Sequence, residues 1–184
     1  MIKDFNLVIS TYRGRENDCI SELWYLLKDL GDSGMEFSLT GLPGLIVAKT
    51  TLDPLEVVTK IGNQVSEKPW YFRFLLKIVP IQLTVNTDIE LIREKALELA
   101  KKSIAKGETY RVLIRKRLTD IRAEKIIEAI APKIGNKVNL EQPDKIILLE
   151  IIGDVTGIAV IKPEHIVSVQ RIKRQRRVNQ LNEK

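Results

Sequence analysis

The stretch from residue 108 to residue 161 constrains the fold most, because its hydrophobic pattern changes from period two to helical spacing and back. Residues 109–118 alternate in a way that predicts a strand. Residues 120–134 place apolar side chains at core spacing, which predicts a helix. Two apolar runs, 145–152 and 156–161, then predict two strands around a turn. This part of the chain should fold as a mixed unit of helices and strands.

The first of these strands carries apolar side chains on one face and three arginines on the other. Tyr110 and Val112 belong to the apolar face, whereas Arg111 and Arg115 belong to the basic face. The strand leads into the start of the following helix, where free N–H groups and the helix dipole favour an anion. Arg122 lies in the first predicted turn of that helix. Cationic side chains that converge on a helix start indicate a phosphate-binding surface.

The first 79 residues show the order strand, helix, strand, strand, helix, strand. The predicted elements are strands at 5–11, 35–39, 45–49 and 71–79, with helices at 16–30 and from Pro54 onward. This order is the ferredoxin-like plan, an antiparallel sheet with two helices on one face. The fold class is therefore α+β, with a ferredoxin-like domain at 1–79, a second domain at 80–170, and a basic C-terminal tail at 171–184.

The sequence has a net charge of +6, and its basic residues are unevenly distributed. Residues 1–79 hold nine Lys/Arg and ten Asp/Glu, whereas residues 80–184 hold 21 and 14. Such asymmetry is typical of proteins that bind nucleic acid or an anionic membrane. No apolar run approaches the ~20 residues that span a bilayer, and no basic helix carries large apolar anchors, so nucleic acid is favoured over a membrane. The alternative is a solvated basic surface that serves only solubility.

Two further basic clusters each have a structural interpretation. Lys101, Lys102 and Lys106 lie near the end of a helix expected at 87–105, where cations complement the helix dipole. Residues 171–177 contain five basic residues among seven. They form either a frayed tail or an arm that contacts phosphates.

The sequence has no motif that indicates catalysis: GxGxxG, a Walker loop, GxSxG and HExxH are all missing. His165 is the only histidine, too few for a His-based metal site. Cys19 is the only cysteine, so an internal disulfide is excluded and a cytoplasmic location is favoured. We interpret Cys19 as a buried thiol. We therefore expect no catalytic residue, no metal and no cofactor, and a non-enzymatic function.

The segments 110–117, 138–144, 147–150 and 156–160 together carry a family resemblance. In this order they resemble a THUMP domain, the RNA-binding module of several tRNA-modifying enzymes. Members of that family carry a ferredoxin-like domain before the THUMP domain, which matches the pattern of the first 79 residues. The resemblance implies tRNA as a partner.

The segment 73–81 is similar to an arginine- and proline-containing stretch of stand-alone THUMP proteins. In that group the THUMP protein is an adaptor that presents tRNA, and a separate RNA cytidine acetyltransferase makes N4-acetylcytidine. Other THUMP proteins are fused to a methyltransferase, a 4-thiouridine synthetase or a deaminase. The chain stops after Lys184, so we expect the adaptor. The alternatives are the RNA-binding subunit of a split tRNA methyltransferase or thiolation enzyme, and a module for protein interaction or small-anion binding.

The candidate RNA-binding residues are basic side chains of the strand, the helix start and the end of the first domain. They are Arg111, Arg115, Lys116, Arg117, Arg122 and Lys125, with Arg73 and Lys77 as secondary contacts. In a regular strand Lys116 points away from the three arginines. Any one of these residues could instead form an ion pair with Glu124, Glu128 or Glu150.

Overall fold

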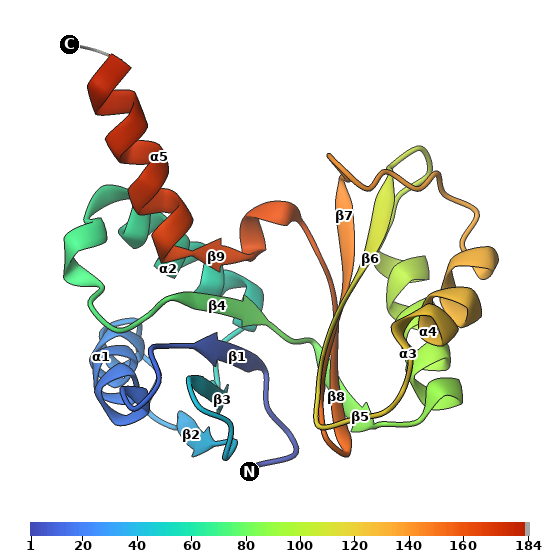
Figure 1. The fold of residues 1–184 in the computed structure, drawn as a ribbon, viewed down its shortest axis with the longest axis horizontal. Coiled ribbons are helices and arrows are strands. Elements are labelled where there is room, and N and C mark those ends of the chain that lie inside the picture. Colours follow the sequence, from blue (N-terminus) through green and yellow to red (C-terminus); the bar gives the residue numbers. More distant parts are fainter. Residues whose placement is uncertain (183–184) are drawn as a thin grey trace. The chain divides into compact units, whose positions relative to one another are not determined.

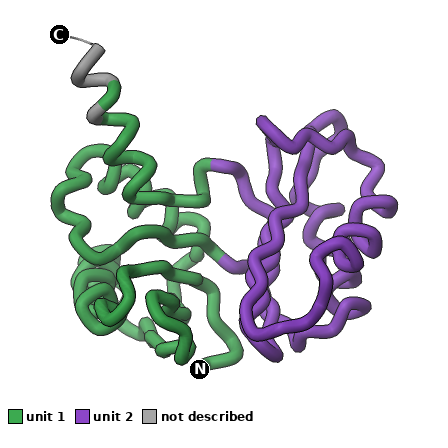
Figure 2. Tube along the Cα trace, viewed as in Figure 1, with its two compact units in different colours: residues 1–80, 164–184 green, residues 81–163 purple. Residues whose placement is uncertain are grey.

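The computed structural model describes residues 1–182, apart from the side chains of residues 177 and 179–182. The chain forms two compact units (Figure 2). Unit 1 comprises residues 1–80 and 164–184, and unit 2 comprises residues 81–163. Each unit has its own sheet and its own apolar core.

Unit 1 contains the ferredoxin-like plan that the sequence predicts. Its elements are β1 (Leu7–Ser10), α1 (Glu16–Asp29), β2 (Glu36–Leu39), β3 (Leu45–Lys49), α2 (Pro54–Glu67), the 3-10 turn η1 (Pro69–Tyr71) and β4 (Lys77–Pro80). The strands form an antiparallel sheet in the order β2-β3-β1-β4-β9, in which β9 (Val167–Ser168) comes from the C-terminal segment (Figure 1). Leu23 of α1 and Ile61 of α2 are buried in one core with Ile9 and Ile46, so both helices cover the same face of the sheet.

The last strand of this plan is shorter than expected, because β4 begins only at Lys77. The carboxylate of Glu22 accepts hydrogen bonds from the backbone N–H groups of Arg73, Phe74 and Leu75, at 2.7, 3.2 and 2.9 Å. Those donors are thus satisfied by a side chain of α1 instead of a neighbouring strand. Arg73 consequently lies in the loop that precedes β4.

The C-terminal segment differs from the domain division expected from the sequence. Residues 164–170 were expected in the second domain and 171–184 in a tail, but the structure joins residues 164–182 to unit 1, and residues 183–184 lie outside the described residues. β9 (Val167–Ser168) pairs antiparallel with β4 and leads into α5 (Val169–Asn182). Val167 and Val169 are buried in the unit 1 core, which is the physical reason for this attachment.

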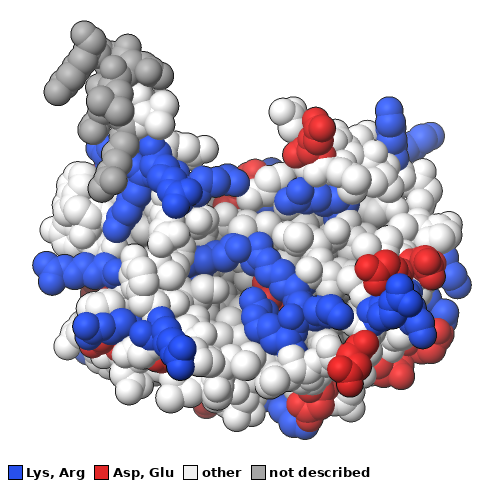
Figure 3. Space-filling view, in the orientation of Figure 1, with Lys and Arg blue, Asp and Glu red and all other residues white. Residues whose placement is uncertain are grey.

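The basic residues of this segment lie on a helix, so the frayed tail is the wrong interpretation. Figure 3 shows Lys and Arg side chains gathered around α5. Lys173 donates a hydrogen bond to the carbonyl oxygen of Phe72 at 2.8 Å, and Arg176 donates one to that of Glu67 at 2.9 Å. The Arg176 guanidinium also lies 5.3 Å from the centre of the Trp70 ring. Arg176 therefore satisfies a carbonyl at the end of α2 that has no partner within that helix.

Unit 2 places two helices over one face of a four-stranded sheet (Figure 1). Its elements are β5 (Leu83–Asn86), α3 (Ile89–Ser103), β6 (Tyr110–Arg117), α4 (Ala123–Ile130), the 3-10 turn η2 (Ala131–Lys133), β7 (Lys145–Ile152) and β8 (Val155–Ile161). The strand order is β5-β8-β7-β6, and β6 runs parallel to β7. Tyr110, Val112 and Ile114 pack in the core beneath α3 and α4, so the predicted apolar face of β6 is confirmed.

The link between β6 and α4 is longer than the sequence suggested. The helix begins at Ala123, and Arg122 is its N-cap, so the arginine precedes the first turn. The Thr119 hydroxyl accepts a hydrogen bond from the backbone N–H of Ile121 at 3.3 Å, which stabilises a local turn in place of another helical turn. No side chain caps the N-terminus of α4, so its first N–H groups have no side-chain acceptor.

Candidate nucleic-acid interface

The basic face of β6 is organised around one acidic residue of β7. Arg115 and Arg117 each place a guanidinium nitrogen near a carboxylate oxygen of Glu150, at 3.1 and 2.8 Å. The Glu150 side chain is 1% exposed, whereas the two arginines are 23% and 29% exposed. The parallel register sets Arg115 opposite Glu150, which explains the contact. The alternative of ion pairing with Glu150 is therefore correct for these two arginines.

This cluster stabilises the pairing of β6 with β7 and remains cationic. A buried carboxylate is tolerated only with cations and hydrogen bonds around it, and Arg115 and Arg117 supply both. Two guanidinium groups share one carboxylate, so the cluster has a net charge of +1. A phosphate could approach it, but it would compete with Glu150 for the same donors.

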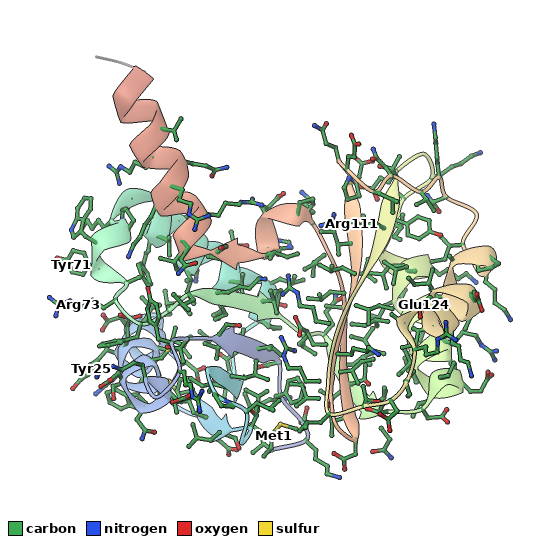
Figure 4. The ribbon with its side chains drawn as sticks, in the orientation of Figure 1. Met1, Tyr25, Tyr71, Arg73, Arg111 and Glu124 are labelled. Atoms are coloured by element: carbon green, nitrogen blue, oxygen red, sulfur yellow. The ribbon has the colours of Figure 1, made fainter. Side chains whose placement is uncertain are left out.

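Two other strand residues hold neighbouring loops. Arg111 donates a hydrogen bond from a terminal nitrogen to the carbonyl oxygen of Leu140, and Lys116 donates one to that of Ile121, both at 3.0 Å. The Arg111 Nε atom is buried without a hydrogen-bond partner among the described residues. Figure 4 labels Arg111. Because Lys116 bonds to the loop before α4, it does point away from the arginines, as expected for a regular strand.

The start of α4 leaves two cations accessible. Arg122 is 71% exposed, and its Nε lies 3.7 Å from a Glu124 carboxylate oxygen, a loose pair of two solvated groups. Lys125 is exposed and has no ion-pair partner in the part of the chain that the structure describes. The uncapped N–H groups of α4 add to this positive surface. Arg73 and Lys77, the secondary candidates, belong to unit 1 and not to this unit.

A lysine-lined hollow in unit 2 is the feature that sequence reasoning missed. It has a volume of about 650 Å³ and lies among the end of α3, the loop into β6 and the segment after α4. Its charged lining residues are Lys101, Lys106, Lys133, Lys137 and Glu108. All four lysines are exposed, and none has a hydrogen-bond or ion-pair partner among the described side chains. We name this feature the lysine hollow.

The architecture of unit 2 explains how the lysine hollow forms. β6 and β7 run parallel, so the segments that enter them lie at the same edge of the sheet. Asn136 donates hydrogen bonds to the carbonyl oxygens of Ala105 and Glu108, at 2.9 and 3.0 Å, which ties the two segments together. The Glu108 carboxylate accepts a hydrogen bond from the Ala105 N–H and lies 3.9 Å from the Lys145 ammonium. The only acidic lining residue is therefore largely compensated, and the lysines dominate the local field.

Other titratable groups serve structural roles. The Asp144 carboxylate accepts hydrogen bonds from the backbone N–H and the hydroxyl of Thr109, and these bonds hold its pKa below the usual value. Burial raises the pKa of the Cys19 thiol to about 12, which agrees with the buried thiol expected from the sequence. Within residues 1–182, no helix is long and apolar enough to cross a membrane, and no group of three or more His, Cys, Asp or Glu side chains could hold a metal ion.

Comparison with known proteins identifies the domain that carries the lysine hollow. Residues 86–161 match the THUMP domain, so the chain contains this domain. No curated protein matches the chain.

Solved structures share the fold over most of the chain. PH1313 from Pyrococcus horikoshii is 21% identical with a TM-score of 0.62, covering 85% of this chain and 55% of that one. TrmN from Thermus thermophilus is 17% identical with a TM-score of 0.58, covering 86% and 46%. A 4-thiouridine synthetase in complex with RNA and ATP is 13% identical with a TM-score of 0.51, covering 86% and 42%. The chain thus spans about half the length of these proteins.

Proposed function

We propose that this THUMP-domain chain binds tRNA and presents it to a separate enzyme, an RNA cytidine acetyltransferase that forms N4-acetylcytidine. The observation that carries the proposal is the lysine hollow inside the THUMP domain, where four ammonium groups without a partner among the described residues surround a concave surface. The fold of the chain is also similar to that of a 4-thiouridine synthetase whose structure contains RNA. Lone cations without intramolecular partners are available to bind phosphates.

The binding mode follows from the kind of groups available. Ammonium groups on flexible side chains contact phosphates and recognise the shape of folded RNA, with little base readout. Four such contacts predict a slope of about −3 when the logarithm of affinity is plotted against that of salt concentration. Arg122 and Lys125 at the start of α4 supply a second contact region. Arg111, Lys116 and the Arg115–Arg117–Glu150 cluster position the surrounding loops and strands.

The adaptor role is supported by the segment 73–81, which is similar to stand-alone THUMP adaptors. Cys19 is a poor nucleophile, because a thiol with a pKa of about 12 stays protonated at neutral pH. The segment 73–81 and the protonated Cys19 thiol both agree with a non-catalytic protein that works in the cytoplasm beside its enzyme.

The decisive experiment compares modified nucleosides in tRNA from cells with and without the gene. Loss of N4-acetylcytidine, restored by the wild-type gene, is the expected result. The second candidate, an RNA-binding subunit of a split methyltransferase or thiolation enzyme, is favoured by the fold shared with a longer 4-thiouridine synthetase. Normal N4-acetylcytidine together with loss of a methylated or thiolated base would establish that candidate and reject the acetylation adaptor.

A further inference from the structure

A second concave surface lies on unit 1, and its lining differs in chemistry from that of the lysine hollow. It has a volume of about 470 Å³ and is formed by α1, the end of α2 and η1. Tyr25 and Tyr71 line it and are 67% and 69% exposed. Figure 4 shows both tyrosines on the same outer side of unit 1. We name this surface the tyrosine groove.

Exposed aromatic side chains are concentrated here in a chain that has few. The sequence contains only four tyrosines, four phenylalanines and two tryptophans. Two pairs of neighbours in the sequence, Trp24 with Tyr25 and Trp70 with Tyr71, are all exposed, between 39% and 69%, and the tyrosine of each pair lines the groove. Large aromatic side chains normally bury much of their surface, and they are enriched where proteins bind other proteins. This concentration indicates an interaction surface.

The charged lining of the tyrosine groove is negative in a chain that is positive overall. Glu22, Asp29, Glu67 and Lys68 are its charged lining residues. Glu22 is committed to three backbone N–H groups, but the carboxylates of Asp29 and Glu67 have no hydrogen-bond or ion-pair partner among the described side chains. The carboxylates favour cations, although Arg73, which Figure 4 labels between the two tyrosines, and Lys68 offset part of their charge.

The positions of the two free carboxylates strengthen this argument. Asp29 is the last residue of α1, and Glu67 is the last residue of α2. The negative end of a helix dipole disfavours an acidic side chain, so neither residue is placed to stabilise its helix. The two helix ends and two carboxylates together focus negative potential on the groove, although Arg176 offsets part of it at α2.

The aromatic rings of this region already hold cations of the chain itself. The Lys28 ammonium lies 4.8 Å from the centre of the Trp24 ring, and the Lys68 ammonium lies 5.8 Å from that of Tyr71. Within the described residues no cation lies over Tyr25, whose ring meets Trp24 edge to face at a centroid distance of 5.2 Å. The Tyr25 ring is thus an open site for an ammonium or guanidinium group.

We infer that the tyrosine groove binds a basic, Lys- or Arg-containing segment of a partner protein. A cation of that segment stacks on Tyr25, and its neighbours pair with Asp29 and Glu67. The identity of the partner rests on the proposed function: for an adaptor, the partner is the modifying enzyme. The tyrosine groove and the lysine hollow have no lining residue in common, so the inference assigns them different ligands.

The test places the photocrosslinking residue p-benzoylphenylalanine at Tyr25 of the full chain in cells. The expected product is a crosslink to a protein segment of net positive charge, identified by mass spectrometry. The same substitution at Tyr12, a 47% exposed tyrosine that does not line the groove, should not yield that segment. A crosslink to RNA, to a neutral or acidic segment, or to nothing would overturn the inference.

Charge reversal separates this surface from the tRNA site. Asp29→Lys with Glu67→Lys should lower the yield of the Tyr25 crosslink at least fivefold, because repulsion replaces pairing. Glu36→Lys with Glu56→Lys, which changes net charge equally outside the groove, should not lower it. An unchanged yield in the first variant rejects the groove. If the wild-type chain fails to bind tRNA while the crosslink persists, the proposed function is rejected and the groove stands.

Discussion

Unit 1 and unit 2 each hold fifteen Lys/Arg and twelve Asp/Glu, so each has a net charge of +3. They use these charges differently. In unit 2, four lysines that have no partner in the described part of the chain surround one hollow. In unit 1, Arg176 and Lys173 bind backbone carbonyls, and two carboxylates for which the described side chains provide no partner line the tyrosine groove. Charges left without partners, more than net charge, therefore mark the surfaces that are available for ligands.

The sharpest contrast within unit 2 is between its paired and unpaired cations. Glu150→Gln should lower the free energy of unfolding by about 3 kcal/mol, because it leaves Arg115 and Arg117 without their buried counterion. Glu124→Gln is the matched control and should change it by less than about 0.5 kcal/mol, since Glu124 is 66% exposed. Urea unfolding measures the change in the free energy of unfolding of both variants. Equal, small effects would show that the Glu150 cluster is not structural and that its arginines are free for RNA.

The lysine hollow itself is tested by reversing the charge of two of its lysines. Lys133→Glu with Lys137→Glu should weaken tRNA binding by about 30-fold, roughly 2 kcal/mol, and should make the salt dependence shallower by about two units. Lys60→Glu with Arg13→Glu changes net charge equally on unit 1 and should have a much smaller effect. Gel shifts at several salt concentrations give both quantities. If the two variants weaken binding equally, net charge and not the hollow controls affinity.

The sequence predicts the elements of both units well where the pattern is local. Period two and helical spacing set the ferredoxin-like order, and Tyr110 and Val112 correctly mark the core face of β6. The pairing of Arg115 with Glu150 depends on the register of two parallel strands that are separated in sequence by a helix. The sequence could therefore name Glu150 only as one of three possible ion-pair partners. The lysine hollow depends on the same parallel pairing, which brings together two segments about 30 residues apart.

The C-terminal segment shows a different reason for a wrong expectation. Along the sequence the surplus charge falls in the second half, but folding returns residues 164–182, with five Lys/Arg and one Asp/Glu, to unit 1. The attachment depends on a two-residue strand and two buried valines, Val167 and Val169. So short an apolar signal cannot be told from a loop by periodicity alone. The strand expected to contain Arg73 was too long for a similar reason, because a distant carboxylate, Glu22, satisfies its N–H groups.

Substitution of Arg176 tests whether the cations of α5 serve intramolecular contacts instead of RNA binding. Arg176→Met should lower the free energy of unfolding by about 1 kcal/mol, because the carbonyl oxygens of Ser66 and Glu67 lose a charged donor and Trp70 loses its cation. Affinity for tRNA should change less than twofold. Denaturant unfolding and a gel shift on the same sample measure both. A large loss of tRNA affinity at unchanged stability would mean that α5 contacts RNA, and the contrast between the units would fail.

The smallest effect concerns the acidic helix end in the tyrosine groove. Asp29→Asn should raise the free energy of unfolding by about 0.5 kcal/mol, since it removes a negative charge from the C-terminal end of α1. Asp18→Asn is the matched control in the first turn of the same helix, where the dipole favours an acid and Arg15 lies 3.0 Å away, so it should lower stability by a similar amount. Stability changes of opposite sign in thermal unfolding would show that Asp29 destabilises its helix. The presence of Asp29 would then require a reason other than stability, such as a cationic ligand. The same sign for both would remove that reason and leave the groove with its aromatic side chains alone.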